Sequence, residues 1–336
     1  MRILLTTTSY QDTPGHHHEL LEASGFDIVP ARGPLSESAL LGLLEQQVSG
    51  GGGFDGLLNG DDEITARFID AALAAPVPLR AIAKYGIGLD TIDVQHATRN
   101  KIPVLFTPGV NHTTVAEHAF GLMIAASKHF YKHMSAVKLG RWERQTGTEL
   151  AGKTLAVLGM GRVGREVAKR ARAFEMTVIG FDAYWDDDFA QTHQVERCAS
   201  AQDALGHADV VSLHLPCTAE TRGLIGRKII GEMKNGVIIV NTARGGLVDE
   251  DAIADACESG GIGAYATDVL AHEPIQTPHR FQTIDNILVT PHIGSRTFES
   301  VQRQAVRATR NLVNYLQDNP DYIQANELPA EDQPAD

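Results

Sequence analysis

The sequence predicts an α/β fold with two doubly wound parallel sheets, one domain being inserted into the other. Short apolar runs alternate with helix-like stretches along most of the 336 residues, which is typical of parallel sheets with right-handed crossovers. The alternation comes in two series, separated by a long apolar stretch at residues 113–137. The glycine-rich loop GMGRVG, residues 159–164, opens the second series almost halfway along the chain. A chain of this length can form two domains with separate cores.

The first series predicts one sheet of roughly flavodoxin type. Apolar runs bounded by turn residues read as buried strands, and stretches with apolar residues at helical spacing read as helices. The stretch at 113–137 then predicts one long helix with a broad apolar face. The expected strands are residues 2–8, 26–30, 54–60, 79–86 and 102–107, and the expected helices are 14–25, 36–47, 64–75 and 94–100.

The second series predicts a complete doubly wound domain. A final helix at 298–317 begins soon after its last strand, so we expect that helix to return to the first domain. The first domain then comprises residues 1–109 and 297–336, and the second comprises 110–296. The acidic tail is expected to be mobile. The expected strands of the second domain are 154–159, 177–182, 209–216, 236–243, 263–270 and 286–292, with a helix at 163–174, and the tail is 327–336.

Composition excludes several classes of partner. A formal net charge of −13 argues against nucleic acid and anionic membranes, because both favour a basic surface. No apolar run is long enough to cross a bilayer. The three cysteines have neither a disulfide pattern nor zinc spacing, so we expect reduced thiols in the cytoplasm. His129 and His133 have a spacing that suits a metal, but no further ligands accompany them, and we expect no metal site.

The glycine loop predicts a dinucleotide-binding turn between a strand and a helix. Gly159 permits the tight turn, Gly161 lets the backbone approach a pyrophosphate, and Gly164 lets the helix pack against the strand. Arg162 and Val163 would offer N–H groups of the helix N-terminus to the phosphates. The alternative is a tight turn that binds no ligand.

Asp182 ends the next strand, where an acceptor for the two ribose hydroxyls is expected. A carboxylate there repels a 2′-phosphate, and Asp186, Asp187 and Asp188 add negative charge nearby. We therefore predict NAD rather than NADP as cofactor. A role of Asp182 in capping a turn remains the alternative.

Three polar residues follow three later strands. Arg244 comes after the strand at 236–243, Glu273 after the next and His292 after the last. Ligands bind at the carboxyl edge of such sheets, where a guanidinium can hold a carboxylate with two hydrogen bonds. A histidine exchanges protons near neutral pH, and a neighbouring carboxylate can orient its ring. The alternative is three unrelated surface residues.

With these motifs the chain resembles the D-isomer-specific 2-hydroxyacid dehydrogenase family, in its phosphoglycerate dehydrogenase-like branch. The resemblance implies a substrate-binding domain at 1–109 and 297–336, an inserted NAD-binding domain at 110–296, and a cleft between them. It also implies that Arg244 binds the substrate carboxylate, that His292 is the general acid/base, and that Glu273 pairs with His292. Formate dehydrogenases of similar fold have glutamine in place of Glu273. The matching segments are KYGIGLDTID, TPGVNHTTVAEHAFGLM, LGMGRVGREVAKR, HLP, NTARGGLVDE, DVLAHEP and TPHIGS.

The resemblance implies further contacts with both ligands. The turn at 84–88 would offer backbone N–H groups to the substrate carboxylate, and Lys84 would either add charge for a distal anion or lie on the surface. Asp268 would lie close to the nicotinamide carboxamide, and Thr114 would either approach that ring or only cap its helix. The implied substrate residues are Lys84, Tyr85, Gly86, Ile87 and Gly88, and the remaining cofactor residues are Thr114, Leu215, Pro216, Thr242, Ala243, Asp268 and Gly294.

The native substrate stays open at this point. His16, His17 and His18 begin a helix and, together with Arg32, are candidates for binding a phosphate or phosphonate; a solvated first turn is the alternative. Candidate substrates are 3-phosphoglycerate, hydroxypyruvate, glyoxylate and a phosphonate analogue, including an aldehyde-type one. The chain ends soon after its last helix, so no regulatory domain for feedback by serine is expected.

The resemblance also bears on assembly and on rival functions. Residues 113–137 would form a two-fold homodimer. An NAD-sensing protein similar to transcriptional corepressors is the main rival function, and a hydrolase of the adenosylhomocysteine type is a second.

Overall fold

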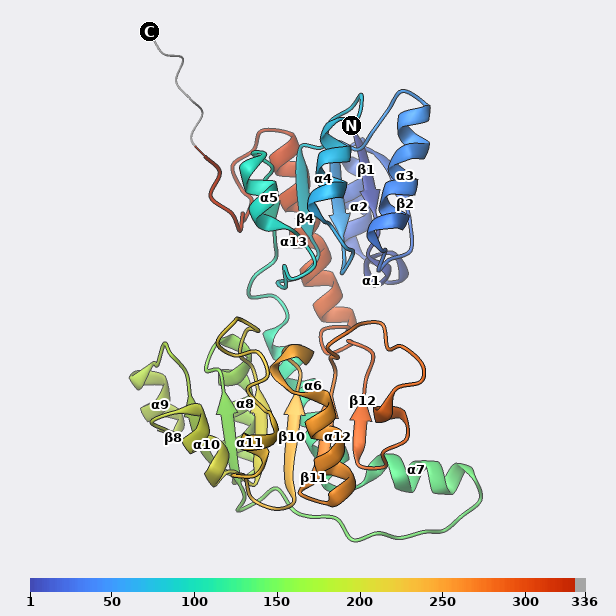
Figure 1. Ribbon diagram of the computed structural model, residues 1–336. Coiled ribbons are helices and arrows are strands. Elements are labelled where there is room, and N and C mark those ends of the chain that lie inside the picture. Colours follow the sequence, from blue (N-terminus) through green and yellow to red (C-terminus); the bar gives the residue numbers. More distant parts are fainter. Residues whose placement is uncertain (330–336) are drawn as a thin grey trace. The chain divides into compact units, whose positions relative to one another are not determined.

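The computed structural model describes residues 1–329, and its chain divides into two compact units (Figure 1). Unit 1 comprises Met1–Asn111 together with Arg296–Asp336, and unit 2 is the continuous stretch His112–Ser295. The sequence placed the boundaries after residues 109 and 296. Most of the acidic tail expected to be mobile, residues 330–336, lies outside the described residues.

Unit 1 contains a five-stranded parallel sheet. The strand order is β2-β1-β3-β4-β5, which is the order of flavodoxin-like sheets and agrees with the flavodoxin type predicted from the sequence. The strands are β1 (Arg2–Leu5), β2 (Asp27–Pro30), β3 (Gly56–Asn59), β4 (Ala81–Lys84) and β5 (Val104–Leu105).

Successive strand residues point to opposite sides of this sheet, and the residues on both sides are apolar. Helices therefore cover both faces. Ile3 and Leu5 pack with the final helix, whereas Leu4 packs with the helices of the other face. The final helix therefore belongs to unit 1, as the sequence predicted. One face carries α1 (Thr8–Asp12), α2 (His16–Ala23) and α13 (Phe298–Leu316), and the other carries α3 (Glu37–Ser49), α4 (Ala66–Leu73) and α5 (Val94–Arg99).

Unit 2 contains a seven-stranded parallel sheet of Rossmann type. The order is β12-β11-β10-β9-β6-β7-β8. Strands β7 and β8 are therefore added on one side of β6 and strands β9 to β12 on the other, and the switch point of the sheet lies between β6 and β9. The strands are β6 (Thr154–Leu158), β7 (Thr177–Phe181), β8 (Val195–Arg197), β9 (Val210–Leu213), β10 (Val237–Asn241), β11 (Ile262–Thr267) and β12 (Ile287–Val289).

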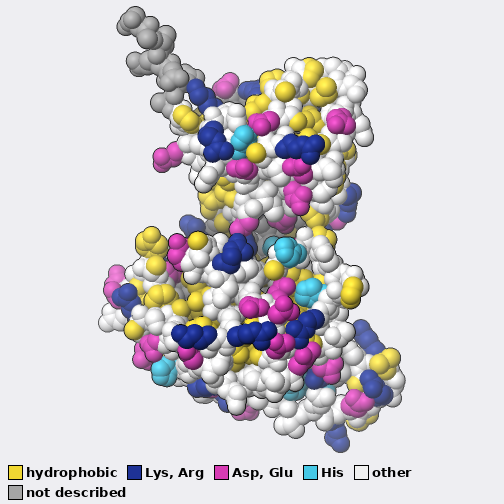
Figure 2. Space-filling view, viewed as in Figure 1, with side chains coloured by type: hydrophobic (Ala, Val, Ile, Leu, Met, Phe, Trp, Pro, Cys, Tyr) yellow, Lys and Arg dark blue, Asp and Glu magenta, His cyan; other side chains and the backbone are white. Residues whose placement is uncertain are grey.

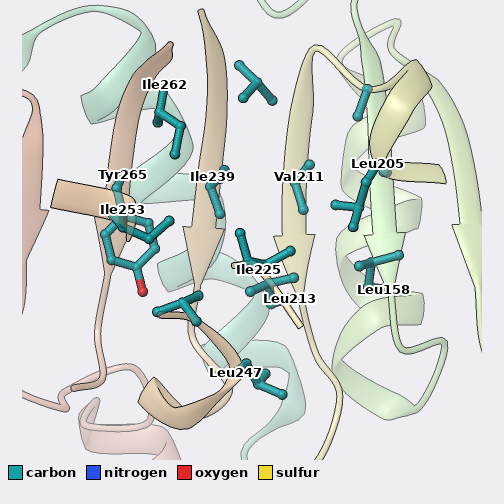
Figure 3. Packing of buried hydrophobic residues seen from close by; sticks show 14 of the residues in the cluster. Leu158, Leu205, Val211, Leu213, Ile225, Ile239, Leu247, Ile253, Ile262 and Tyr265 are labelled. Atoms are coloured by element: carbon teal, nitrogen blue, oxygen red, sulfur yellow. The ribbon is translucent and has the colours of Figure 1, made fainter. Parts of the chain in front are cut away.

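Two apolar layers enclose this sheet. Figure 3 shows one layer, in which Val211 and Ile239 of neighbouring strands meet Leu205 and Ile253 of the covering helices. The layer on the opposite face includes Ala119 and other apolar residues of the helix at 112–127. The helices are α6 (His112–Ser127), α7 (Phe130–Lys138), α8 (Arg162–Ala173), α9 (Asp187–His193), α10 (Ala201–His207), α11 (Arg227–Ile230) and α12 (Glu250–Ser259).

The single long helix expected at 113–137 is wrong. The chain forms α6 and α7, separated by Lys128 and His129, and the φ of His129, 52°, lies in the left-handed region. A left-handed residue cannot continue a right-handed helix, so α7 leaves in a new direction. The short elements α1 and β8 were not expected, and β5 is shorter than the predicted strand.

Candidate active site

The carboxyl ends of six parallel strands in unit 2 carry the residues singled out from the sequence. Gly159 follows β6 and Asp182 follows β7. Arg244 follows β10, and His292 follows β12, which is two strands away in the sheet. All of these strands are parallel, so their carboxyl ends lie at one edge of the sheet.

The glycine loop has the geometry of a phosphate-binding turn. Gly159 has a φ of 96°, which a side chain disfavours. A Cβ on Gly164 would lie 1.9 Å from the carbonyl oxygen of Gly159, so α8 packs directly on the turn. A Cβ on Gly161 would meet nothing within 4 Å. That open space lies at the N-terminus of α8, where Arg162 and Val163 begin the helix, and it fits a dinucleotide pyrophosphate.

Asp182 both shapes the turn and lies where a ribose is expected. Its Oδ2 accepts a hydrogen bond from Met160 N at 2.6 Å, and its Oδ1 accepts one from Tyr184 N at 2.8 Å. Each carboxylate oxygen has a second lone pair, so these bonds do not exclude hydroxyl donors. The capping role and the ribose role that the sequence offered as alternatives are therefore compatible.

Asn241, at the end of β10, shapes the loop that carries Arg244. Its side chain donates to the Arg244 carbonyl at 2.9 Å and accepts from Ala243 N at 3.0 Å. Arg244 Nη1 donates to the Ala243 carbonyl at 2.7 Å, and the backbone of Arg244 is extended. The next residue, Gly245, lies against the backbone of Leu270, which brings this loop beside the one that leads to Glu273.

His292 and Glu273 are hydrogen-bonded. His292 Nδ1 lies 2.6 Å from Glu273 Oε2, while Glu273 Oε1 accepts from Leu270 N at 2.8 Å. A carboxylate only accepts, so Nδ1 carries the proton and Nε2 is the atom that exchanges one with a ligand. The pairing predicted from the sequence is thus present in the fold, and both side chains are part-exposed.

Asp268 organises the backbone around His292. Its carboxylate, only 3% exposed, accepts from Thr290 Oγ1 at 2.6 Å, Ile293 N at 2.9 Å and Gly294 N at 2.7 Å, and His118 Nε2 lies at 3.3 Å. Burial alone would raise the pKa of Asp268, but the bonds from His118, Thr290 and Ile293 outweigh it and hold the pKa below its usual value.

Three of these contributors were missed in the sequence, namely Asn241, His118 and Thr290. Asn241 could have been found, because an asparagine at a strand end is a frequent shaper of turns. His118 gave no such signal, because its partner Thr290 is 172 residues away.

Of the other cofactor candidates, Leu215 and Pro216 follow β9, Thr242 and Ala243 follow β10, and Thr114 lies in α6. Thr114 is buried in the first turn of α6, Leu215 packs against the core beyond β9, and Pro216 is exposed. Ala243 is half-buried beside Thr242, whose buried Oγ1 has no protein hydrogen-bond partner within residues 1–329. That hydroxyl is suited to a ligand at this edge.

The turn at residues 84–88 lies in unit 1, after β4. Tyr85 N donates to the Asn59 carbonyl at 2.8 Å and Gly86 N donates to Thr107 Oγ1 at 3.1 Å, so these two N–H groups are already engaged. Ile87 and Gly88 complete the turn. Burial raises the pKa of the Tyr85 hydroxyl to about 12, which keeps it protonated.

Lys84 is buried, so of the two alternatives offered for it, the surface position is wrong. Its ammonium donates to the Gly60 carbonyl and to Asp61 Oδ1, both at 2.6 Å. It therefore ties the end of β4 to the loop after β3.

The histidine run does not form one exposed cluster of imidazoles. His17 is fully buried, with Nε2 3.1 Å from the Tyr10 carbonyl and Nδ1 3.4 Å from Gln302 Oε1. Burial lowers its pKa, which keeps the ring neutral. The solvated first turn offered as the alternative is therefore also wrong for His17.

The other candidates for anion or metal binding have protein partners. His16 pairs with Glu19, and Arg32 binds Asp12 through both terminal nitrogens at 2.6 and 3.0 Å. His133 Nε2 accepts from Gln145 N. Among residues 1–329, no group of three or more potential ligands could hold a metal ion. The same residues include no helix long and apolar enough to span a membrane.

Comparison with known proteins places the chain in a family. The family described as "D-isomer specific 2-hydroxyacid dehydrogenase, NAD binding domain" matches residues 120–294. Hydroxypyruvate reductase of Thermotoga maritima is 40% identical over 258 residues, which cover 76% of this chain and 82% of that protein. D-3-phosphoglycerate dehydrogenase of Archaeoglobus fulgidus is 40% identical over 255 residues, which cover 75% of this chain but 48% of that enzyme.

A solved structure agrees along most of the chain. The TT0316 protein of Thermus thermophilus superposes with a TM-score of 0.84 at 32% identity, covering 97% of this chain and 100% of that one. The matched family segment contains the glycine loop, Asp182, Arg244 and the pair of Glu273 with His292. The chain therefore belongs to the D-isomer-specific 2-hydroxyacid dehydrogenase family, in its phosphoglycerate dehydrogenase-like branch, and is an NAD-dependent oxidoreductase.

Proposed function

We propose that the protein interconverts a small anionic 2-oxoacid and its D-2-hydroxyacid. The observation that carries this proposal is the 2.6 Å contact between His292 and Glu273 at the edge of the sheet that also carries Arg244. When bound, NADH would supply the hydride to C2 in reduction and NAD⁺ would accept it in oxidation.

The residues of unit 2 would perform the acid–base part of the reaction. Arg244 would bind the substrate carboxylate and polarise the C2 oxygen, because a guanidinium presents two parallel donors. His292 Nε2 would donate a proton to the C2 oxygen during reduction and take it back during oxidation. Glu273 would accept the Nδ1 proton and stabilise the charged ring in between.

In unit 1 the turn at 84–88 would bind the substrate carboxylate. Because Tyr85 N and Gly86 N are already donated to protein groups, Ile87 and Gly88 are the better candidates for this contact. Their role is a proposal that rests on the family resemblance.

Among the open substrates, we favour hydroxypyruvate or glyoxylate over a phosphorylated or phosphonate acid. The cationic candidates for a distal phosphate are engaged: His17 is buried and neutral, Lys84 is paired with Asp61, and Arg32 with Asp12. The Thermotoga relative is named a hydroxypyruvate reductase.

The test is a panel of 2-oxoacids with NADH, with and without a terminal phosphate or phosphonate. We expect turnover of the short unphosphorylated acids.

His292→Ala should lower kcat by about 10²–10⁴-fold while NAD affinity changes little, because a general acid/base is lost. Arg244→Lys should also fail, since an ammonium cannot supply two parallel donors. An inert wild-type protein that still binds NAD would contradict the enzyme and favour an NAD-sensing protein.

We also propose that the protein forms a homodimer through α7 and the segment that follows it. Apolar side chains are exposed there, from 47% at Phe130 to 81% at Trp142. Figure 2 shows hydrophobic side chains together with basic and acidic ones on the projecting part that α7 occupies in Figure 1. An apolar patch of this kind is typical of a subunit interface.

We also propose that the protein is located in the cytoplasm. Its three cysteines are unpaired, which is consistent with a reducing compartment.

A further inference from the structure

An arginine of α8 hydrogen-bonds to the same loop residue as Asp182, the carboxylate expected to bind the ribose, and a second aspartate holds that arginine in place. Arg165 Nε donates to the Met160 carbonyl at 2.9 Å, and Arg165 Nη1 lies 2.8 Å from Asp186 Oδ2. The N–H of the same Met160 donates to Asp182 at 2.6 Å. Met160, a residue of the glycine loop, therefore hydrogen-bonds both to the guanidinium of Arg165 and to the carboxylate of Asp182, which is expected to bind the ribose.

The two oxygens of Asp186 have separate tasks. Oδ1 caps α9 by accepting from Phe189 N at 2.9 Å, while Oδ2 binds Arg165. The Phe189 ring also lies 5.1 Å from the centre of the guanidinium, which restricts its orientation. The N–H of Phe189, together with the charge of Arg165, holds the pKa of Asp186 below its usual range, so the carboxylate stays ionised.

The pair borders an open hollow. The hollow has a volume of about 600 Å³ and is lined by Arg165, Tyr184, Trp185, Asp186, Asp187 and Asp188. Five of its six lining residues, 184–188, come soon after β7 and Asp182, where the 2′ position of a bound ribose is recognised. An arginine in such a place is the group that binds the 2′-phosphate in NADP enzymes. Here its charge is balanced by Asp186.

We propose that Asp186 is a determinant of cofactor specificity, because it holds Arg165 and prevents that guanidinium from binding the 2′-phosphate of NADP. Discrimination then has two sources. Asp182 repels the 2′-phosphate directly, and Asp186 forms an ion pair with the Arg165 guanidinium that would otherwise attract the phosphate. The inference depends on the binding of NAD and not on which acid the enzyme reduces.

The experiment measures binding of NAD and NADP to the enzyme without substrate, by calorimetry. Asp186→Asn keeps the oxygen that caps α9 but replaces the oxygen bound to Arg165 with an amide that can only donate. We expect the ratio of Kd for NADP to Kd for NAD to fall by about tenfold or more, because a charge-assisted contact to phosphate becomes available. Asp187→Asn is the matched control, since it removes the same charge from an exposed neighbour; its ratio should change less than about twofold.

A second variant separates the arginine from the general charge of the hollow. Arg165→Met combined with Asp186→Asn should remove the gain, because the proposed phosphate ligand is gone. Equal gains in the Asp186→Asn and Asp187→Asn proteins, or a gain that survives Arg165→Met, would overturn the proposal. Asp186→Ser, which also caps helices, replaces Asp186→Asn if the latter does not fold. A wild type that binds NAD but reduces no 2-oxoacid would refute the proposed function and leave this test intact.

Discussion

His292 occupies an unusual backbone position that its neighbours determine. Its φ is 51°, in the left-handed region, where a side chain other than glycine is uncommon. Its N–H donates to the carbonyls of Asp268 and Thr290, both at 3.0 Å. The Asp268 carboxylate also accepts hydrogen bonds from the N–H groups of Ile293 and Gly294, the two residues that follow His292. The buried carboxylate therefore holds the turn that presents the imidazole.

Asp268→Asn tests this role. Asparagine has one acceptor oxygen, so its amide would face the N–H of Gly294, which needs an acceptor. We expect a loss of stability of about 1–3 kcal/mol and a lower kcat, because a buried donor loses its partner and His292 moves. Urea unfolding and steady-state kinetics measure the two effects. Asp285→Asn, at an exposed carboxylate, is the control. An unchanged kcat would assign Asp268 a role outside the positioning of His292.

Some site residues could be predicted from the sequence and others could not, for a physical reason. Arg244, Glu273 and His292 each follow an apolar strand, and the carboxyl edge of a parallel sheet is where ligands bind. The groups that hold the turn of His292 come partly from a distant element, because His118 of α6 contacts both Thr290 and Asp268. Local patterns carry no information on such contacts.

His17 predicts a dependence of stability on pH. Its pKa is lowered in the fold by burial, and it faces Tyr10, His18 and Gln302. The unfolded chain therefore binds a proton more readily, and this group's contribution is present above the unfolded pKa of about 6.5 and lost as pH falls below it. His17→Gln should reduce the slope of unfolding free energy between pH 7 and pH 5, by at most about 1.4 kcal/mol per pH unit. Denaturant unfolding at several pH values measures this slope, and an equal slope in both proteins would contradict the prediction.

At the scale of elements, the turn from β6 to α8 combines a packing contact with a ligand contact. Gly164 faces the carbonyl of Gly159, whereas Gly161 faces open space. Gly164→Ala should destabilise unit 2, by roughly 1–3 kcal/mol or more, because its methyl group overlaps backbone. Gly161→Ala should leave stability nearly unchanged but weaken NAD binding, because the methyl group occupies the space of the pyrophosphate. Thermal unfolding and calorimetry distinguish the two, and equal NAD affinity in Gly161→Ala and wild type would remove the pyrophosphate from this loop.

The elements themselves were largely predictable, because buried parallel strands are continuous apolar runs. The failures have local causes. The break at His129 depends on one backbone angle, which the apolar pattern of 113–137 does not reveal. Strand β8 has only one buried residue, Val195, since it lies at the edge of its sheet. Helix α1 has five residues and one buried side chain, Tyr10, so its helical period is too short to detect.

At the scale of the whole molecule, the insertion explains why the glycine loop lies so far along the chain. Unit 1 is begun by β1 and completed by α13, whose Ala305, Ala308 and Leu312 pack into its core. Unit 2 is continuous from residue 112 to residue 295 and has its own two apolar layers. The order of motifs in the sequence therefore follows from one domain interrupting another.

The exposed apolar surface of α7 and the segment after it leads to a last prediction, on assembly. Met134, Leu139 and Trp142 are 59%, 70% and 81% exposed, although each is a large apolar residue. Covering such a surface with a second copy removes it from water, and a two-fold axis is the commonest way to do so. We expect the wild-type protein to sediment as a dimer at micromolar concentration. Leu139→Asp combined with Met134→Asp should give a monomer, because two charges would be buried at the interface. Val48→Asp, at an exposed apolar residue of α3, is the matched control and should remain dimeric. A wild type that sediments as a monomer would assign this surface to another partner.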